Sequence, residues 1–437
     1  MAAPEYEGEV SPNAVMLIDA KTGAVLYEKN ADGVIRPAST TKIMTCIVAL
    51  ENSNLDDVVK VGPEGDWTGS GYSLLGTKNG EEIVMRDLLY GLMLVSGNDA
   101  AEAVAVHVAG SVERFVSKMN RKAEELGMTE TRFHNPHGTD TDGHVVTARD
   151  MSILALYAMQ NETFMDIVGT ASYDMPATNK NSAREVLNTN HLLRTDEDAA
   201  EGAYYEYATG IKTGSTPKAF RCLVSAAEKD GMALLCLIFG DETEHGTQRW
   251  PTAKSLFEFG FSSFRTVDMQ TVIDTQPSPT IKVSGSENDD DILSLNVRNT
   301  GEQLVTMDRA LAEKISAPGG LTETVELYGA ESLAAPLGMG DVVGLVTYRD
   351  AETNEVVCQG ELSASRDVSV QSGEVTIEIT QETERPANAT PQPTPQPESE
   401  EDEGVVIGLG WLWIALGVVL LALIVVLVIS LVRGSRR

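Results

Sequence analysis

Cysteine is scarce in this chain of 437 residues. The four cysteines are Cys46, Cys222, Cys236 and Cys358. Their spacing matches no zinc-binding pattern, and four thiols are too few for a disulfide-stabilised scaffold. Cys222 and Cys236 flank a predicted turn at residues 228–231, so adjacent strands could bring them together. Because free cysteine is among the most buried residue types, we interpret both as buried free thiols.

Basic side chains are also few compared with acidic ones. Lysine and arginine number 33 against 65 aspartates and glutamates, and the formal charge is −32. Nucleic-acid phosphates need a basic face, so this balance argues against a nucleic-acid partner. Neutral or polymeric partners fit better, and most of the excess acid is expected to solvate the surface.

A secretory signal is missing from the first residues, because MAAPEYEGEV has neither a basic nor an apolar segment. Residues 405–432, in contrast, carry no charge and are long enough to cross a bilayer. An acidic stretch precedes this run and the basic tail 433–437 follows it. The positive-inside rule then predicts a cytoplasmic tail and an extracytoplasmic body. Since such a body must be exported, we expect that a signal peptide was removed from the start of the chain.

Changes in composition and in hydrophobic pattern divide the chain into five parts. Strand-like runs lie near both ends of residues 1–264, with helical patterns between them, which predicts an α+β domain whose antiparallel sheet joins both ends. Residues 265–382 contain short alternating runs and predict a small all-β domain. The Pro-rich acidic residues 383–404 predict an extended linker. A transmembrane helix, 405–432, and the cytoplasmic tail, 433–437, complete the chain.

Helical periodicity in the first domain is found in four places. The predicted helices cover residues 39–52, 86–109, 111–127 and 251–261. In the second domain all regular runs are interpreted as strands, including TVIDTQ at 271–276.

A candidate nucleophile lies in RPASTTKIMTCIVALEN, residues 36–52. Pro37 suits the first turn of a helix, and the apolar residues after it suit a buried helix. Ser39 and Lys42 are three positions apart, so they share one face. The positive end of a helix dipole favours an oxyanion formed beside Ser39. Burial next to other cations would lower the pKa of Lys42 enough for it to act as a base.

Ser-x-x-Lys alone is a weak signal, and a second match occurs at residues 215–218. Pro217 disfavours a helical pairing there. Ser-x-Asn is weaker still, and its serines are Ser11, Ser96, Ser286 and Ser294. Only Ser96-Gly97-Asn98 lies between two apolar helical segments, where we expect a loop that faces a cleft.

Lys-Thr-Gly occurs twice, and the two copies differ in context. Residues 21–23 follow Asp19 between two short strands, which predicts the tip of a hairpin. Residues 212–214 lead into an apolar strand and come after Ser39 and Ser96 in the chain. The second copy is therefore the candidate site, and the first is interpreted as a turn.

Three motifs thus occur in order, and together they are more specific than any one of them. They are Ser39-x-x-Lys42, Ser96-Gly97-Asn98 and Lys212-Thr213-Gly214. With them, residues 8–380 resemble the low-molecular-mass, penicillin-binding, serine-type D-Ala-D-Ala carboxypeptidases. FHNPHGTDTDGHVVTARDM, NTNHLL and RWPTAKSLFEFGF are further similar stretches.

This resemblance implies a fold and a reaction. The fold is a five-stranded antiparallel sheet flanked by helices, followed by a β-rich domain and a membrane anchor. The reaction removes the terminal D-alanine from peptidoglycan stem pentapeptides through an acyl-serine intermediate. No metal or organic cofactor is implied, and β-lactams are expected to acylate the same serine.

The resemblance also implies the catalytic roles. Ser39 would be the nucleophile and Lys42 its base, and Ser96 would relay a proton to the leaving amine. The backbone N–H groups of Ser39 and Ser215 would form the oxyanion hole.

Substrate binding is implied for five further residues. Asn98 would hold the substrate backbone, and Lys212 would support proton relay electrostatically. Thr213, next to Gly214, would bind the terminal carboxylate together with Arg249.

One position departs from the family pattern. Phe220 stands in STPKAFRC where a small residue, often glycine, is usual. This difference concerns the fit of one edge of the substrate and not the class of reaction.

Three alternatives remain open at this point. A metal site is suggested by the cluster His134, His137, Asp140, Asp142 and His144, although no predicted helix places two ligands one turn apart. A serine β-lactamase would share the three motifs, but Glu185-Val-Leu-Asn188 is one residue short of the spacing expected for its deacylating glutamate. A membrane-tethered receptor could be acylated by β-lactams without turnover.

Overall fold

The computed structural model describes residues 4–67, 71–243, 246–287, 291–317, 319–329 and 332–370. The predicted linker 383–404, the predicted transmembrane helix 405–432 and the tail 433–437 lie outside the described residues. Within the ranges given, no helix has both the length and the apolar character needed to span a bilayer.

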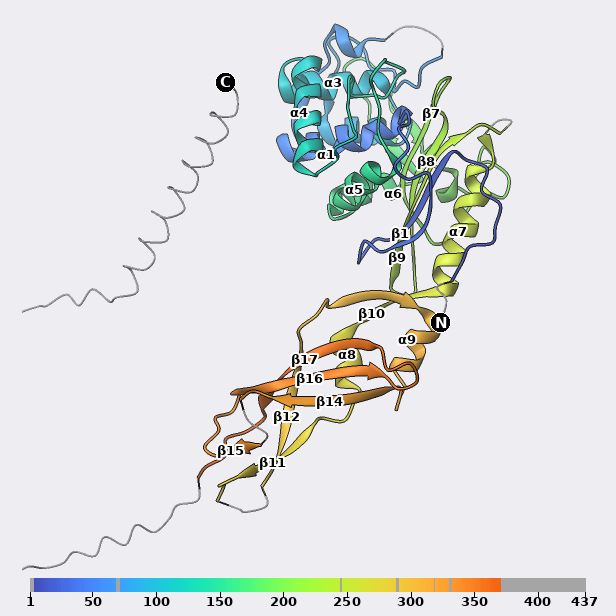
Figure 1. Ribbon diagram of the computed structural model, residues 1–437. Helices are drawn as coiled ribbons and strands as arrows, with labels where there is room; N and C mark the ends of the chain where they lie inside the picture. The colour runs from blue at the N-terminus through green and yellow to red at the C-terminus, as the bar shows by residue number, and fades with distance from the viewer. Residues whose placement is uncertain are drawn as a thin grey trace, which may run out of the picture. The chain divides into compact units, whose positions relative to one another are not determined.

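Strands from both ends of the first domain form its central sheet (Figure 1). The strand order is β2-β1-β9-β8-β7, and every neighbouring pair is antiparallel. The strands are β1 (Ala14–Asp19), β2 (Val25–Lys29), β7 (Ala208–Thr216), β8 (Phe220–Lys229) and β9 (Met232–Asp241). The expected five-stranded antiparallel sheet is confirmed.

Helices cover both faces of this sheet, with α7 on one face and the other helices on the opposite face (Figure 1). The helices are η1 (Ala38–Thr41), α1 (Lys42–Asn52), α2 (Met85–Met93), α3 (Asn98–Ala109), α4 (Val112–Glu125), α5 (Ala148–Met159), α6 (Glu162–Gly169) and α7 (Arg249–Ser263). Successive side chains of a strand point to opposite faces, so Met16 and Ile18 join one hydrophobic cluster and Val15 and Leu17 the other. The layers are therefore helices, sheet and helix.

The helical predictions for this domain were incomplete. The helical pattern over 86–109 forms two helices, α2 and α3, and the loop expected around Ser96-Gly97-Asn98 separates them, with Ser96 at a positive φ of 63°. The polar stretch after residue 127 contains α5 and α6, which were not predicted. Shorter elements complete the domain: β3 (Val58–Lys60), η2 (Pro63–Gly65), β4 (Glu82–Val84), β5 (Ser172–Met175), β6 (Arg184–Leu187) and η3 (His191–Leu193).

The second domain has its own hydrophobic cluster and a six-stranded sheet of order β14-β16-β17-β12-β11-β15. Its elements are β10 (Phe264–Asp268), α8 (Met269–Asp274), β11 (Thr280–Ser284), β12 (Ile292–Asn299), β13 (Leu304–Asp308), α9 (Arg309–Ile315), β14 (Leu321–Leu327), β15 (Leu333–Ala334), β16 (Val342–Asp350) and β17 (Val356–Ala364). β10 pairs with β13 in a separate ribbon.

The prediction of a strand at 271–276 was wrong, because most of this segment lies in helix α8. The Asp268 carboxylate accepts the N–H groups of Gln270 and Thr271 and so caps the helix. Met269, Val272 and Ile273 are buried at helical spacing. The second domain is therefore not purely β.

The first Lys-Thr-Gly copy forms the hairpin tip between β1 and β2. Gly23 has a positive φ of 77°, a conformation that favours glycine. The Lys21 ammonium donates to the Gly231 carbonyl at 2.5 Å, and the Thr22 hydroxyl is hydrogen-bonded to that of Thr306. These contacts are those of a structural turn.

All four cysteines are free and buried. Cys222 on β8 packs into the cluster beneath the larger helical layer, whereas Cys236 on β9 packs towards α7. The two thiols therefore lie on opposite faces of the sheet.

Candidate active site

Ser39 and Lys42 lie at the junction of η1 and α1. Pro37 precedes η1 with a φ of −77°, and Lys42 is the first residue of α1. The Lys42 Nζ atom lies 3.1 Å from the Ser39 Oγ atom. The three-residue spacing read from the sequence thus brings an amine into hydrogen-bond reach of a hydroxyl.

Lys42 is fully buried in a site rich in acceptors. Its Nζ atom also donates to Asn98 Oδ1 and to the His137 carbonyl, both at 2.8 Å. Burial lowers the pKa of Lys42 well below its ordinary value, and the nearby Lys212 ammonium lowers it further, whereas Asp99 opposes the shift. Burial therefore favours the free amine of Lys42 beside the Ser39 hydroxyl.

Asn98 reaches this pair from the first position of α3, and Ser96 lies two residues before it in the loop between α2 and α3. The positive φ of Ser96 turns the chain so that Asn98 can begin α3. The Ser96 Oγ atom is buried and has no hydrogen-bond partner among the described residues. A buried hydroxyl of this kind is available to a substrate or to a water molecule.

Strand β7 supplies the third motif on the other side of the site. Lys212 is buried, its Nζ atom has no hydrogen-bond partner within the described chain, and burial lowers its pKa to about 7. The Thr213 hydroxyl donates to the Thr189 Oγ1 atom at 2.7 Å. A methyl group added at Gly214 would come within 3.2 Å of the Ser39 backbone nitrogen. Glycine therefore allows the strand to pass directly against the serine.

Ser215 directly follows the third motif on β7, and Arg249 comes from helix α7. Ser215 is exposed, and its hydroxyl is hydrogen-bonded to the Arg221 guanidinium. Arg249 begins α7, with its guanidinium carbon 4.4 Å from the centre of the Trp250 ring. Burial and the neighbouring Arg221 lower the pKa of Arg249 to about 10. No hydrogen bond joins Arg249 to Thr213 in the part of the chain described.

The role of Asp99 was not predicted from the sequence. This buried carboxylate accepts the backbone N–H groups of Leu75, Gly76 and Thr77 at 2.7–2.9 Å. It thereby fastens residues 71–77, which we name the strap, to the start of α3. Nothing in the sequence indicates which distant backbone groups a carboxylate will bind.

His137 was also missed, since its contribution to Lys42 is a backbone carbonyl that any residue could supply. Its ring lies 3.4 Å from a Glu102 carboxylate oxygen and packs edge-on against Trp67. Burial lowers the pKa of His137. The neutral ring therefore helps to hold the carbonyl that faces Lys42.

The side chains of the possible metal cluster form hydrogen bonds with different residues. His144 Nε2 is 3.0 Å from the Thr41 hydroxyl, and Asp140 accepts from the Thr216 hydroxyl. The described residues contain no group of three ligands arranged for a metal ion.

Glu185, the residue considered as a lactamase base, is exposed and pairs with Asp174 across β5 and β6. Asn188 is buried and donates to two backbone carbonyls, those of Val168 and Thr170. Both residues are thus accounted for by local structure.

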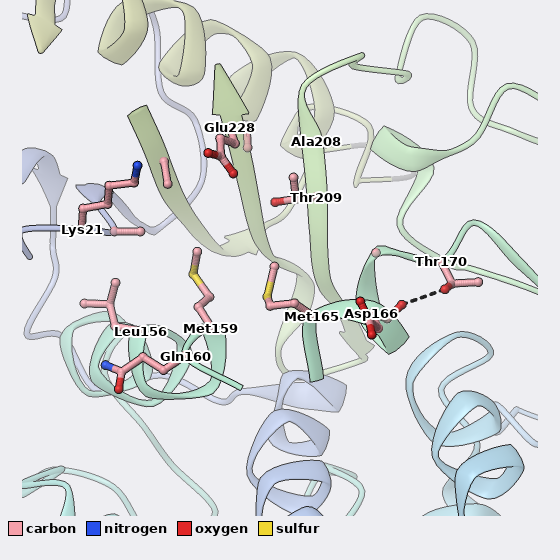
Figure 2. A pocket seen from close by; sticks show the side chains of 14 residues that line it. Lys21, Leu156, Met159, Gln160, Met165, Asp166, Thr170, Ala208, Thr209 and Glu228 are labelled. Carbon is pink, nitrogen blue, oxygen red and sulfur yellow. Dashed lines mark hydrogen bonds between the residues drawn. The ribbon is translucent and has the colours of Figure 1, made fainter. Parts of the chain in front are cut away.

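A hollow of about 710 Å³ lies at the opposite end of β7, near the start of the strand (Figure 2). Lys21, Met159, Met165 and Glu228 are among the side chains around it. It contains none of the motif residues Ser39, Lys42, Ser96 and Lys212. The size of this hollow therefore does not identify it as the reactive centre.

Comparison with known proteins agrees with this geometry. The family model for D-alanyl-D-alanine carboxypeptidase matches residues 1–243. D-alanyl-D-alanine carboxypeptidase DacF of Bacillus subtilis is 35% identical over 256 residues, which cover 58% of this chain and 63% of the relative. DacC of Escherichia coli, a protein with the same description, is 31% identical over 353 residues, or 78% of this chain and 80% of the relative.

Solved structures show the same likeness. Penicillin binding protein 5 from Haemophilus influenzae matches with a TM-score of 0.59 and 25% identity, over 84% of this chain and all of that one. A mutant of the Streptomyces K15 DD-transpeptidase matches with a TM-score of 0.53 and 32% identity, over 59% of this chain and 100% of the other.

Proposed function

The chain belongs to the D-alanyl-D-alanine carboxypeptidase family of serine peptidases, and on this premise we propose that Ser39 removes the terminal D-alanine from peptidoglycan stem pentapeptides. The observation that carries this proposal is the 3.1 Å approach of Lys42 Nζ to Ser39 Oγ, combined with the lowered pKa of Lys42. Together they supply a partly exposed nucleophile and its fully buried base in one site.

In the first step Ser39 Oγ attacks the carbonyl of the penultimate D-alanine while Lys42 takes its proton. An ester forms between the serine and this carbonyl carbon, and the amide bond to the last D-alanine breaks. Ser96 passes a proton to the leaving amine, for which its unpaired buried hydroxyl is suited. The backbone N–H groups of Ser39 and Ser215 stabilise the oxyanion. In the second step water cleaves the ester.

Substrate binding falls to the residues around this pair. Asn98 orients the peptide backbone, and the Lys212 ammonium supports proton transfer through its field. Thr213 and Arg249 take the terminal carboxylate, with Gly214 leaving room along β7. A penicillin would acylate Ser39 in the same way, because its ring carbonyl occupies the position of the scissile amide.

The experiment is a time course of mass spectra with penicillin, together with an assay of D-alanine release from a peptide ending in D-Ala-D-Ala. We expect one adduct on Ser39 and steady release, and neither with Ser39→Ala. Ser11→Ala, an exposed serine outside the site, is the control. Rapid hydrolysis of nitrocefin would indicate a lactamase, and a permanent adduct without D-alanine release would indicate a receptor.

The cellular location is part of the proposal. The charge-free run 405–432 and the basic residues after it support a single-pass anchor with the catalytic domain outside the cytoplasm. Removing residues 404–437 should give a soluble protein with unchanged D-alanine release. A soluble but inactive product would mean that this segment does more than anchor.

A further inference from the structure

A second hollow, of about 440 Å³, lies on the motif side of the sheet. We name it the β7–β8 hollow. Its walls include Gly71, Ser215, Phe220, Arg221, Asp241 and Glu242. Its size falls in the range of sites that hold a small organic group.

Two segments that line the β7–β8 hollow also border the proposed active site. Ser215 directly follows Gly214, where strand β7 passes the backbone of Ser39. Gly71 belongs to the strap, and the nearby Ser73 carbonyl accepts the Asn98 N–H group at 2.9 Å. An acyl group on Ser39 that extended along β7 from Gly214 towards Ser215 would reach this hollow.

The charged groups of the hollow are not equally available. The buried Asp241 carboxylate accepts the Thr243 N–H and hydroxyl groups and the Arg249 N–H group. Glu242 is exposed and makes no hydrogen bond or ion pair within the described residues. The Arg221 guanidinium holds the Ser215 hydroxyl through one of its nitrogens. The hollow thus presents one uncommitted carboxylate and one guanidinium with donors to spare.

Phe220 adds an apolar wall. Its side chain remains 43% exposed, and its φ of +56° is a left-handed conformation that bulky residues rarely adopt. This position after the third motif is the one at which the chain departs from the family's usual small residue. The left-handed φ belongs to the short connection between β7 and β8, where Phe220 pairs with Thr216, and it leaves the ring exposed beside the hollow.

We propose that the β7–β8 hollow binds the side chain of the third stem-peptide residue and selects a diamino acid that ends in both an ammonium and a carboxylate, as diaminopimelate does. This inference rests on the proposed function. The third residue immediately precedes the D-alanine that is joined to Ser39. Its ammonium faces Glu242, its carboxylate faces Arg221, and its methylene groups cover Phe220. A lysine in this place leaves Arg221 without an anionic partner.

The test compares D-alanine release from two stem pentapeptides that differ only at the third residue, diaminopimelate or lysine. We expect kcat/KM to favour diaminopimelate by about tenfold or more. Arg221→Gln should remove most of this preference by slowing the diaminopimelate peptide, and Glu242→Gln should slow both peptides. Glu228→Gln, at the opposite end of the sheet, is the control and should preserve the preference.

Equal rates for the two peptides would overturn the proposal. It would also fail if Arg221→Gln slowed both equally, because the residue would then recognise the C-terminal carboxylate that both peptides share. Binding of the two corresponding tetrapeptides to Ser39→Ala, measured by calorimetry, needs no turnover. If the wild type released no D-alanine from either pentapeptide, the proposed function would fail, and the tetrapeptide preference would still decide the role of the hollow.

Discussion

Lys42 Nζ lies 3.1 Å from Ser39 Oγ and is also 2.8 Å from two oxygens that can only accept hydrogen bonds. A neutral amine has two N–H donors and one lone pair. The two donors match Asn98 Oδ1 and the His137 carbonyl, which leaves the lone pair for the serine proton. The contacts of Lys42 thus suit the neutral form that a base requires.

The rate of acylation should depend on pH through both buried lysines. It should rise as Lys42 loses its proton, at a pH well below 10.5, and fall as Lys212 loses its own near pH 7. Because the two lysines interact, the rising and falling limbs of the pH–rate profile report apparent pKa values of the pair and not of either lysine alone. Lys212→Arg keeps the charge and should move the alkaline limb to higher pH. The measurement is the rate of acylation by penicillin as a function of pH in the wild type and in Lys212→Arg. An alkaline limb at the same pH in both would show that it does not report the titration of Lys212.

Burial of Lys212 should cost stability, and the cost should depend on pH. Its pKa is about 7 in the folded protein and 10.5 ordinarily. This loss of stability is therefore fully present below pH 7. It shrinks between pH 7 and about pH 10.5, because in that range the unfolded chain binds more protons than the folded protein does. Lys212→Met should raise the free energy of unfolding by a few kcal/mol at pH 6 and by less at pH 9. Urea denaturation tests this, with the exposed Lys21→Met as control, and an equal gain at both pH values would contradict it.

The two Lys-Thr-Gly copies should respond differently to the same substitution. Lys212→Ala removes a buried charge of the site and should lower D-alanine release by orders of magnitude. Lys21→Ala removes only the contact with the Gly231 carbonyl and should leave release within a few-fold. The reverse order of effects would mean that the wrong copy has been assigned to the site.

Gly214→Ala should slow acylation through a steric effect. The new methyl group would stand 3.1 Å from both the Ala38 Cβ atom and the Pro37 carbonyl. Strand β7 must then move away from the serine by a few tenths of an ångström. Because a misplacement of about 1 Å can cost about 100-fold in rate, we expect acylation to slow by several-fold. Gly301→Ala, whose methyl group would meet nothing closer than 3.7 Å, is the matched control. Equal acylation rates in the two variants would show that the strand tolerates the shift.

Asp99→Asn should release the strap. The amide keeps the size of the side chain but offers one acceptor oxygen where the carboxylate offers two, so some strap N–H groups lose their partner. We expect a loss of stability of about 1–3 kcal/mol and slower acylation. The acid limb of the acylation profile should also move to lower pH, since the charge of Asp99 raises the pKa of Lys42. Thermal unfolding combined with the pH profile checks both effects, and an unchanged acid limb would contradict the electrostatic part.

The sequence predicts those parts of the site whose chemistry resides in side chains at short, fixed spacing. Ser39 with Lys42, and Lys212 within a strand, are of this kind. The contributions of Asp99 and His137 were not predicted, because both act through backbone groups that come together only in the folded chain. Helix α8 was misread for a related reason, since its capping residue and first apolar residue precede the segment that resembled a strand.

The pairing of β1 with β9 has a consequence for how the protein is made. Ala14 faces Phe239 in the sheet, so the first strand emerges long before its partner does. Contacts of such long sequence separation form slowly. Until the chain has been synthesised as far as residue 241, β1 has no β9 to pair with. The apolar helix after Ser39 also lacks part of the sheet against which it packs. The centre of the first domain can therefore assemble only after most of that domain has been synthesised.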